Sequence, residues 1–124
     1  MTVSELFDST IWIDYFIKGS FKEKIEKSEI FGLSALSLFE IRRKLLKNKE
    51  LEKEEIEDRM QFIKKKSIIY NVDEKIADKA SEIAEEEKLG AVDALIYATS
   101  ILNDAILITL DNDFRGLKNV EIVG

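Results

Sequence analysis

Four acidic residues stand at positions from which they could form a metal site. Asp8 follows the apolar pair Leu-Phe, and Asp111 follows the apolar run Ile-Leu-Ile-Thr-Leu. Glu40 and Asp93 lie near the starts of helix-like segments. Because the carboxyl ends of parallel strands meet at one edge of a sheet, all four carboxylates could gather there.

The residue types that are absent narrow the chemistry further. The chain has no histidine and no cysteine. It therefore lacks the usual general base, thiolate nucleophiles and the usual ligands of zinc, and oxygen atoms are its main chemical resource. If the protein is an enzyme, we expect it to work through a hard divalent cation.

Asp8 and Glu40 each have a structural explanation as well. Asp8 precedes a predicted helix and could serve as its N-cap. Glu40 lies three residues after Ser37 and four residues before Lys44, so it could complete a capping box or form an ion pair along the helix. For Glu40 taken alone, the structural explanation is favoured.

Structural explanations exist for the other acids too. Asp93 opens a predicted helix, where a carboxylate offsets the helix macrodipole. Asp111 and Asp113 flank an asparagine in a sequence that is typical of turns. Four independent caps and turns, however, would not need to fall at the same end of a sheet. Their shared placement therefore favours one common site.

The composition indicates a globular protein. The chain has 124 residues, and we expect one domain that spans residues 1–124 around a single core. Hydrophobic residues make up 45% and charged residues 35%, and no apolar run approaches the roughly 20 residues that cross a membrane. The first residues have neither the basic nor the apolar part of a signal peptide, so we expect a cytoplasmic protein without a membrane partner.

The net charge of −6 argues against a protein that binds nucleic acid through a broad basic face. It does not exclude a nuclease, because clustered carboxylates contribute to that total and bound cations would offset it. Basic runs remain at residues 42–49 and 64–66. Either run alone is best interpreted as a solvated helix face whose cations pair with the abundant glutamates.

Strand-like and helix-like segments alternate along the chain. Apolar runs predict strands at residues 4–7, 30–33, 67–72, 106–109 and 120–123. Helical spacing predicts helices at residues 10–16, 21–27, 53–66, 73–88 and 91–101, and another that begins at Ser34 or Ser37 and ends near residue 47. Strands separated by helices predict an α/β fold with a parallel sheet covered on both faces.

The predicted helix at residues 53–66 carries an apolar stripe. Ile56, Met60 and Ile63 recur at helical spacing. We expect exposed surface around this stripe to bind a protein partner, although the stripe could instead be used inside the monomer. Farther along the chain, Gly90 is predicted to end the helix at residues 73–88, and the apolar helix that follows should be buried.

Four segments also resemble the motif blocks of a known family. The segments DSTIWIDYF at residues 8–16, LSALSLFEI at 33–41, VDALIYATS at 92–100 and LITLDNDF at 107–114 are similar to the four blocks of PIN domains. They occur in the family's order and with family-like spacing. The nearest similarity is to the VapC-type toxin ribonucleases, and it extends from Asp8 to the last predicted strand.

The resemblance implies a three-layer α/β/α sandwich with a mostly parallel central sheet. It also implies an endoribonuclease activity that depends on Mg²⁺ or Mn²⁺ and acts on single-stranded or looped RNA. Catalytic and metal-binding roles are implied for the acidic quartet, which consists of Asp8, Glu40, Asp93 and Asp111.

Residues beside the acidic quartet match the family pattern in part. Ser9 and Thr109 match its supporting hydroxyl residues, and Asp113 is an additional carboxylate that could support the site or contact substrate. Leu110 departs from the pattern, because it stands where the family often has an arginine. This departure affects the expected contact with substrate and leaves the acids unchanged.

Partners are implied by the same resemblance: an RNA substrate, a second copy of the chain in a homodimer, and a cognate antitoxin that places an arginine or lysine near the acids. The main alternative is a non-catalytic protein-interaction module on the same fold, in which the acids serve only as caps. A metal titration would separate the two. A receiver-like phospho-acceptor domain fits less well, because the chain lacks paired acids early on and a lysine after a late strand.

Overall fold

A parallel sheet forms the centre of the protein. Within residues 3–27 and 29–124, which the computed structural model describes, five strands form one sheet in the order β3-β2-β1-β4-β5. The strands are β1 (Glu5–Phe7), β2 (Phe31–Ser34), β3 (Ser67–Tyr70), β4 (Ile106–Thr109) and β5 (Val120–Ile122). Each of their pairings is parallel, which confirms the predicted sheet.

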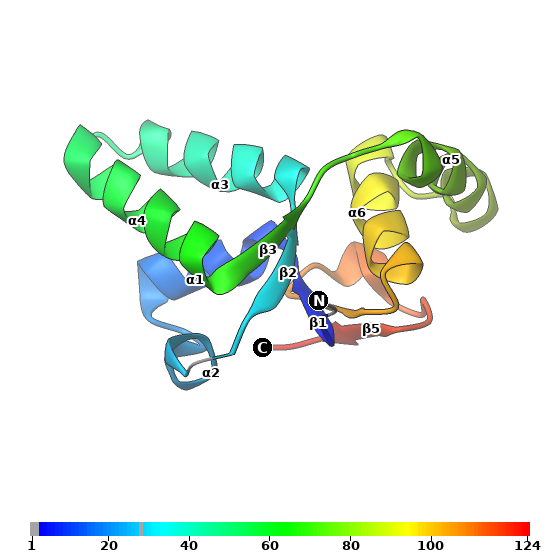
Figure 1. Cartoon of the computed structure of the whole chain (residues 1–124), viewed down its shortest axis with the longest axis horizontal. Helices are drawn as coiled ribbons and strands as arrows, with labels where there is room; N and C mark the ends of the chain where they lie inside the picture. The colour runs from blue at the N-terminus through cyan, green and yellow to red at the C-terminus, as the bar shows by residue number, and fades with distance from the viewer. Residues whose placement is uncertain (1–2, 28) are drawn as a thin grey trace.

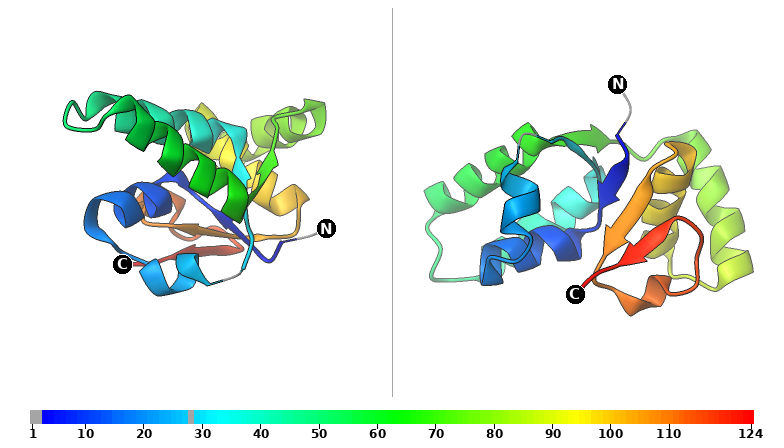
Figure 2. Two further views of the ribbon diagram at one scale, coloured as in Figure 1. Left: turned by 60° about the vertical axis from the view of Figure 1, so that its left-hand side comes forward. Right: turned by 90° about the horizontal axis from the view of Figure 1, so that it is seen from below.

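Helices cover both faces of the sheet and give a three-layer α/β/α sandwich, as predicted (Figure 1). One face carries α1 (Ser9–Lys18), α2 (Lys22–Glu26), α3 (Ala35–Lys47) and α4 (Lys53–Lys66), and the other carries α5 (Glu74–Glu87) and α6 (Ala91–Leu102). Figure 2 shows the two helical layers from further directions. Among the described residues, no helix is long and apolar enough to cross a membrane.

Two hydrophobic cores form, one on each face of the sheet, where a single core was predicted, because side chains alternate along each strand. In β1, Leu6 packs with α5 and α6, whereas Phe7 packs with the helices of the opposite face. Leu107 and Ile108 divide between the two cores in the same way in β4. Phe7 also stacks on Phe31, with ring centroids 4.1 Å apart. Because both faces are covered, a central strand such as β4 is almost wholly apolar, which is why it could be predicted.

Gly32 allows β2 to pack closely within the sheet. A Cβ atom at this position would lie 3.0 Å from a ring carbon of Tyr70 and 3.0 Å from Cγ2 of Val3. These separations are shorter than ordinary van der Waals contacts, so a side chain at Gly32 would displace its neighbours. The position matters for the site because β2 leads directly into α3, which carries Glu40.

Helix α3 begins at the first of the two predicted starts. The Ser34 hydroxyl accepts a hydrogen bond from Leu36 N at 3.1 Å, which makes Ser34 the N-cap. Ser37 lies in the first turn, and its buried hydroxyl has no hydrogen-bond partner among the described residues. The predicted capping box between Ser37 and Glu40 is therefore wrong. Glu40 also forms no ion pair with Lys44 in the described part of the chain.

The prediction that Gly90 ends α5 is also wrong. Lys88 is the C-cap of α5 and adopts the left-handed conformation, with φ at 57°. Gly90 is instead the N-cap of α6. Glycine is found at both kinds of helix boundary, and only Leu89 lies between the two caps, so the sequence pattern could not assign it.

The apolar stripe on α4 is not an exposed partner surface. Ile56, Met60 and Ile63 are 4%, 3% and 0% exposed, and they pack in the core that α1 and α3 share with the sheet. Their predicted exposure is wrong. Helical spacing marks a face of a helix, and here that face turns toward the core.

The order of the strands places a topological switch beside β1. The chain passes from β1 to its neighbour β2 on one side, whereas β4 pairs with β1 on the other side. In open α/β sheets, ligands bind in the crevice at the carboxyl ends of strands where the connections diverge in this way. The carboxyl ends of β1 and β4 are therefore the place to look for a functional site.

Candidate metal centre

Asp8 lies at the carboxyl end of β1, is 4% exposed and is held by three hydrogen bonds. Its Oδ1 accepts a hydrogen bond from Ser9 N at 2.8 Å, which caps α1. Its Oδ2 accepts hydrogen bonds from the hydroxyls of Thr10, at 3.0 Å, and Thr109, at 2.7 Å. Burial raises the pKa of Asp8, the three hydrogen bonds lower it, and the Asp111 carboxylate raises it. Asp8 is thus both a helix cap and a rigidly held carboxylate at the switch point.

Thr10 belongs to the site, although its sequence position did not single it out. Its hydroxyl donates to Asp8 Oδ2, accepts a hydrogen bond from Leu110 N at 3.0 Å and lies 3.4 Å from Thr109 Oγ1. Thr10 therefore joins the start of α1 to the end of β4. A hydroxyl residue after Asp8 was the only signal in the sequence, and such residues are common at ordinary helix starts.

The residues predicted to support the acids lie around Asp8. Thr109 is fully buried, and besides donating to Asp8 its hydroxyl accepts a hydrogen bond from Asp111 N at 2.9 Å. Ser9 is buried and contributes its backbone N–H. Leu110, which departs from the family pattern, packs against the core beneath α1–α4. Its position therefore supplies a backbone contact and apolar packing in place of a charge.

Glu40 extends from α3 toward the same carboxylates. Its Oε1 atom is buried and has no hydrogen-bond partner among the described residues. Burial raises the pKa of Glu40, the Ser9 side chain lowers it, and the Asp8 and Asp111 carboxylates raise it. A buried carboxylate oxygen without a partner is costly, and a bound proton or cation would relieve that cost.

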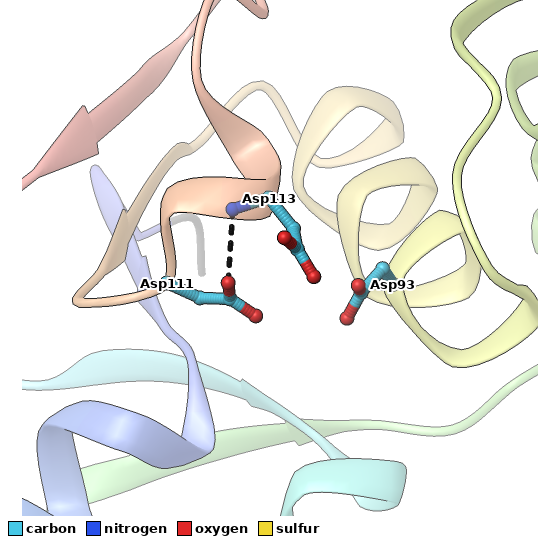
Figure 3. Close-up of side chains that lie close together, drawn as sticks. All are labelled: Asp93, Asp111 and Asp113. Carbon is cyan, nitrogen blue, oxygen red and sulfur yellow. Dashed lines mark hydrogen bonds between the residues drawn. The ribbon is translucent and has the colours of Figure 1, made fainter.

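Asp93, Asp111 and Asp113 point toward one another on the more open side of the site (Figure 3). Asp93 extends from the first turn of α6, and the other two extend from the segment after β4. Each offers one carboxylate oxygen, and these three oxygens lie within 4.8 Å of one another. Asp111 Oδ1 also accepts a hydrogen bond from Asp113 N at 2.9 Å, which caps the short 3₁₀ helix η1 (Asn112–Phe114).

Mutual repulsion links the acids electrostatically. Burial, followed by the charge of Asp111 and then those of the other acids, raises the pKa of Asp93 to about 6. The structure therefore gathers Asp93, Asp111 and Asp113 in one cluster, and it places Asp8 and Glu40 near enough for their charges to raise the pKa of Asp93. We call this group the five-acid site; its members are Asp8, Glu40, Asp93, Asp111 and Asp113.

The five-acid site fits a hard divalent cation. All of its donors are carboxylate oxygens, which Mg²⁺ and Mn²⁺ prefer. Oxygens on opposite sides of an octahedral Mg²⁺ lie about 4 Å apart, because each is about 2.1 Å from the ion. The carboxylate oxygens of Asp93, Asp111 and Asp113 lie within 4.8 Å of one another, which is close to that separation. Glu40 Oε1, which has no hydrogen-bond partner among the described residues, lies outside this cluster of three oxygens.

The fold and the acids agree with the family that the sequence comparison identifies. Residues 6–120 match the PIN domain, and the chain belongs to the PIN domain family. This family of nucleases is the one that the four motif blocks resemble, and the resemblance is confirmed. No curated protein matches this chain.

Several solved structures share the fold. A chain of a toxin-antitoxin complex from Klebsiella pneumoniae is 27% identical, with a TM-score of 0.83 over 95% of this chain and 96% of that chain. VapBC2 from Rickettsia felis, bound to a DNA fragment from its promoter, gives 21% identity and a TM-score of 0.77, with 98% of each chain covered. PAE2754 from Pyrobaculum aerophilum is 18% identical, with a TM-score of 0.76 over 99% of this chain and 91% of that chain. The chain is therefore similar to a chain of a toxin-antitoxin complex, and the two less identical structures show that the fold is shared.

Proposed function

We propose that the protein is a Mg²⁺- or Mn²⁺-dependent endoribonuclease that cleaves single-stranded or looped RNA, and that it is the toxin of a toxin-antitoxin pair. The observation that carries this proposal is the five-acid site, with its unpartnered Glu40 oxygen, at the switch point of a PIN domain sheet. The toxin role is supported by the similarity to chains from toxin-antitoxin complexes.

We assign the cation to the quartet, with Asp113 as an additional ligand. Asp8 Oδ1 accepts a single hydrogen bond and keeps a lone pair for coordination, so Asp8 and Asp93 would be the principal ligands. Asp111 and Glu40 would complete the shell or orient water. When bound, the cation supplies Lewis-acid activation and neutralises charge at the phosphate.

Glu40 would also accept the proton of an attacking water. Its Oε1 atom has no hydrogen-bond partner among the described residues, so it is free to accept a hydrogen bond from a water molecule. Attack by water on the phosphorus, with no participation of the RNA 2′-hydroxyl, breaks the bond to the 3′ oxygen. The products would carry a 5′ phosphate and a 3′ hydroxyl, and both ends can be determined by labelling.

Cleavage of single-stranded RNA by purified acid variants tests the proposal. Asp8→Asn, Glu40→Gln and Asp111→Asn should each reduce the metal-dependent rate by at least about 100-fold and leave the circular dichroism spectrum unchanged. Asp78→Asn, an exposed carboxylate on α5, is the matched control and should cleave like the parent. If all three site variants cut at the parental rate, the activity belongs elsewhere. A folded parent that neither binds metal nor cuts RNA would favour the non-catalytic interaction module.

The antitoxin part of the proposal needs a surface other than the buried α4 stripe. An apolar groove runs between α1, α3 and α4, and its lining is Ile13, Phe16, Ile17, Lys44, Leu45, Lys47, Asn48, Leu51 and Arg59. Ile17 is 64% exposed, and three cations stand in the lining. An amphipathic segment with acidic residues would match this surface, and its end could reach the acids with an arginine or lysine.

Co-expression with the product of the neighbouring gene tests the partner. Size-exclusion chromatography should show co-elution and loss of ribonuclease activity, and the mass of the free protein should correspond to the homodimer that we propose. Ile17→Asp should weaken the complex without slowing cleavage. Leu102→Asp, which is 46% exposed at the end of α6, is the control and should leave the complex intact. An active protein that never retains the neighbour would contradict the antitoxin role.

A further inference from the structure

A second groove lies beside the five-acid site on the other side of α3. Its lining consists of Leu36, Phe39, Glu40, Arg43, Lys44, Lys47 and Val92. Glu40 therefore belongs both to this groove and to the acids. Helix α3 begins at the carboxyl edge of the sheet and extends away from it (Figure 1), and it contacts α6, which carries Val92 and Asp93. We call this surface the α3 groove.

Apolar side chains line the end of the α3 groove that is nearer the acids. Phe39 is 64% exposed, and Val92, next to Asp93, is 42% exposed. Phe39 directly precedes Glu40 in the sequence, and both side chains line this groove. An aromatic ring with this exposure offers a flat face on which an unpaired base can stack.

Cations line the remainder of the groove. Arg43, Lys44 and Lys47 are exposed, and none of them forms an ion pair within residues 3–27 and 29–124. The predicted pairing of this basic run with glutamates holds for Arg42, which bonds to Glu57. Three unpaired cations on an acidic chain, beside a site that must admit a phosphate, match the charge of a nucleic acid backbone.

We propose that the α3 groove binds the single-stranded RNA segment that flanks the scissile phosphate, with a base on Phe39 and phosphates on Arg43 and Lys47. This inference rests on the proposed ribonuclease function and deepens it. A duplex would fit poorly, because paired bases could not stack on a side chain. Glu40 and Lys47 are seven residues apart, so the groove extends about 10 Å from the acids at 1.5 Å per helical residue.

Binding of a fluorescent oligouridylate, measured by anisotropy over a series of salt concentrations, tests the groove. The binding measurements use Asp93→Asn as the reference protein (the parent of the variants below) in Mg²⁺ buffer, because this protein should bind RNA without cutting it. Phe39→Ala in this parent should weaken binding roughly 10-fold through loss of stacking. Arg43→Gln with Lys47→Gln should lower the slope of log affinity against log salt by about 1.4, at about 0.7 for each phosphate contact with a single strand.

Matched controls keep this test specific. Lys22→Gln with Lys65→Gln removes the same charge from exposed positions on α2 and α4, and it should leave the slope unchanged. Competition should rank unlabelled oligouridylate above an RNA duplex. Three results would each overturn the proposal. They are equal salt slopes for the two double variants, no effect of Phe39→Ala on RNA binding, and no RNA binding by the Asp93→Asn parent. Stronger competition by oligothymidylate than by oligouridylate would overturn the assignment to RNA.

Two further measurements distinguish RNA binding in the α3 groove from a contact between two copies of the chain and from the ribonuclease function itself. If the α3 groove is a contact between two copies of the chain, Phe39→Ala will dissociate a dimer in sedimentation and leave RNA affinity unchanged, which would also overturn the proposal. When Phe39→Ala is made in the chain that keeps Asp93, the KM for RNA cleavage with Mn²⁺ should rise about 10-fold and kcat should be retained. If the chain does not cut RNA but the binding effects appear, the ribonuclease function fails while the groove stands as an RNA-binding surface.

Discussion

The hydroxyl of Thr109 donates a 2.7 Å hydrogen bond to Asp8 Oδ2 and so joins the last residue of β4 to the N-cap of α1, 101 positions apart in the sequence. The same hydroxyl accepts a hydrogen bond from Asp111 N. One buried oxygen thereby fixes the positions of two acids of the site. The relationship explains how two central strands can hold carboxylates together although these repel.

Removal of this hydroxyl should destabilise the protein. Thr109→Val keeps the shape of the side chain but leaves a buried carboxylate oxygen with one donor fewer, so the free energy of unfolding in metal-free buffer at pH 7 should fall by about 2 kcal/mol. Thr109→Ser keeps the donor and loses a methyl group, and should cost about 1 kcal/mol. Urea unfolding measures both values. A valine variant as stable as the serine variant would show that the bond contributes little.

Divalent metal should stabilise the folded protein. A ligand that binds only the folded state, at 100 times its dissociation constant, adds about 2.7 kcal/mol to the free energy of unfolding. Mg²⁺ or Mn²⁺ should therefore raise the melting temperature, and Asp93→Asn should shrink that increase. Asp78→Asn removes the same charge from an exposed position on α5 and should keep the full increase. An identical melting curve with and without metal would rule out the shared site.

Asp113 should contribute to metal binding beyond its place in the turn. Its carboxylate lies with those of Asp93 and Asp111, so Asp113→Asn should weaken Mn²⁺ binding roughly 10-fold, measured by titration calorimetry. The cap of η1 uses the backbone N–H of Asp113, so the substitution should leave the fold unchanged. Unaltered Mn²⁺ affinity would reduce Asp113 to a turn residue.

The stability of the metal-free protein should depend on pH through Asp93. Burial and the neighbouring acids raise the pKa of Asp93 to about 6 in the folded state, above its ordinary 3.8. The folded state therefore binds this proton more tightly than the unfolded state does. The contribution of Asp93 to the free energy of unfolding is largest below about pH 4 and is lost as the pH rises through about 6. Relative to the parent, Asp93→Asn should gain stability over this interval. Melting temperatures in EDTA measure the difference, and parallel pH profiles for the two proteins would contradict it.

The α4 stripe should behave as core. Met60 is 3% exposed, so Met60→Ala should lower the free energy of unfolding by about 2–5 kcal/mol. Ile17→Ala, at a side chain that is 64% exposed, should change it by no more than about 0.5 kcal/mol. Chemical denaturation compares the two. If Met60→Ala lowers the free energy of unfolding only slightly, the stripe is available to a protein partner rather than used in the core.

The sequence by itself determined the fold class and the placement of Asp8 and Asp111 at the carboxyl edge of the sheet. Buried parallel strands tend to be continuous apolar runs, whereas amphipathic helices have apolar residues at a spacing of three to four. Both patterns can therefore be recognised in the sequence alone. Asp8 and Asp111 directly follow such runs, and residues in that position must reach the carboxyl edge of a parallel sheet. These local relationships place Asp8 and Asp111 at the same edge, and a shared site for all four acids stays a prediction.

Only the tertiary structure decided which contacts the acids make and which apolar stripe is covered. Thr10 joins the site because it bonds to Leu110, 100 positions away, and no local pattern encodes that distance. Asp113 joins Asp93 because η1 turns its carboxylate toward α6. Helical spacing showed that Met60 lies on an apolar face, but its burial depends on where α4 packs. Such contacts are set by the packing of distant segments, which the order of residues along one element does not specify.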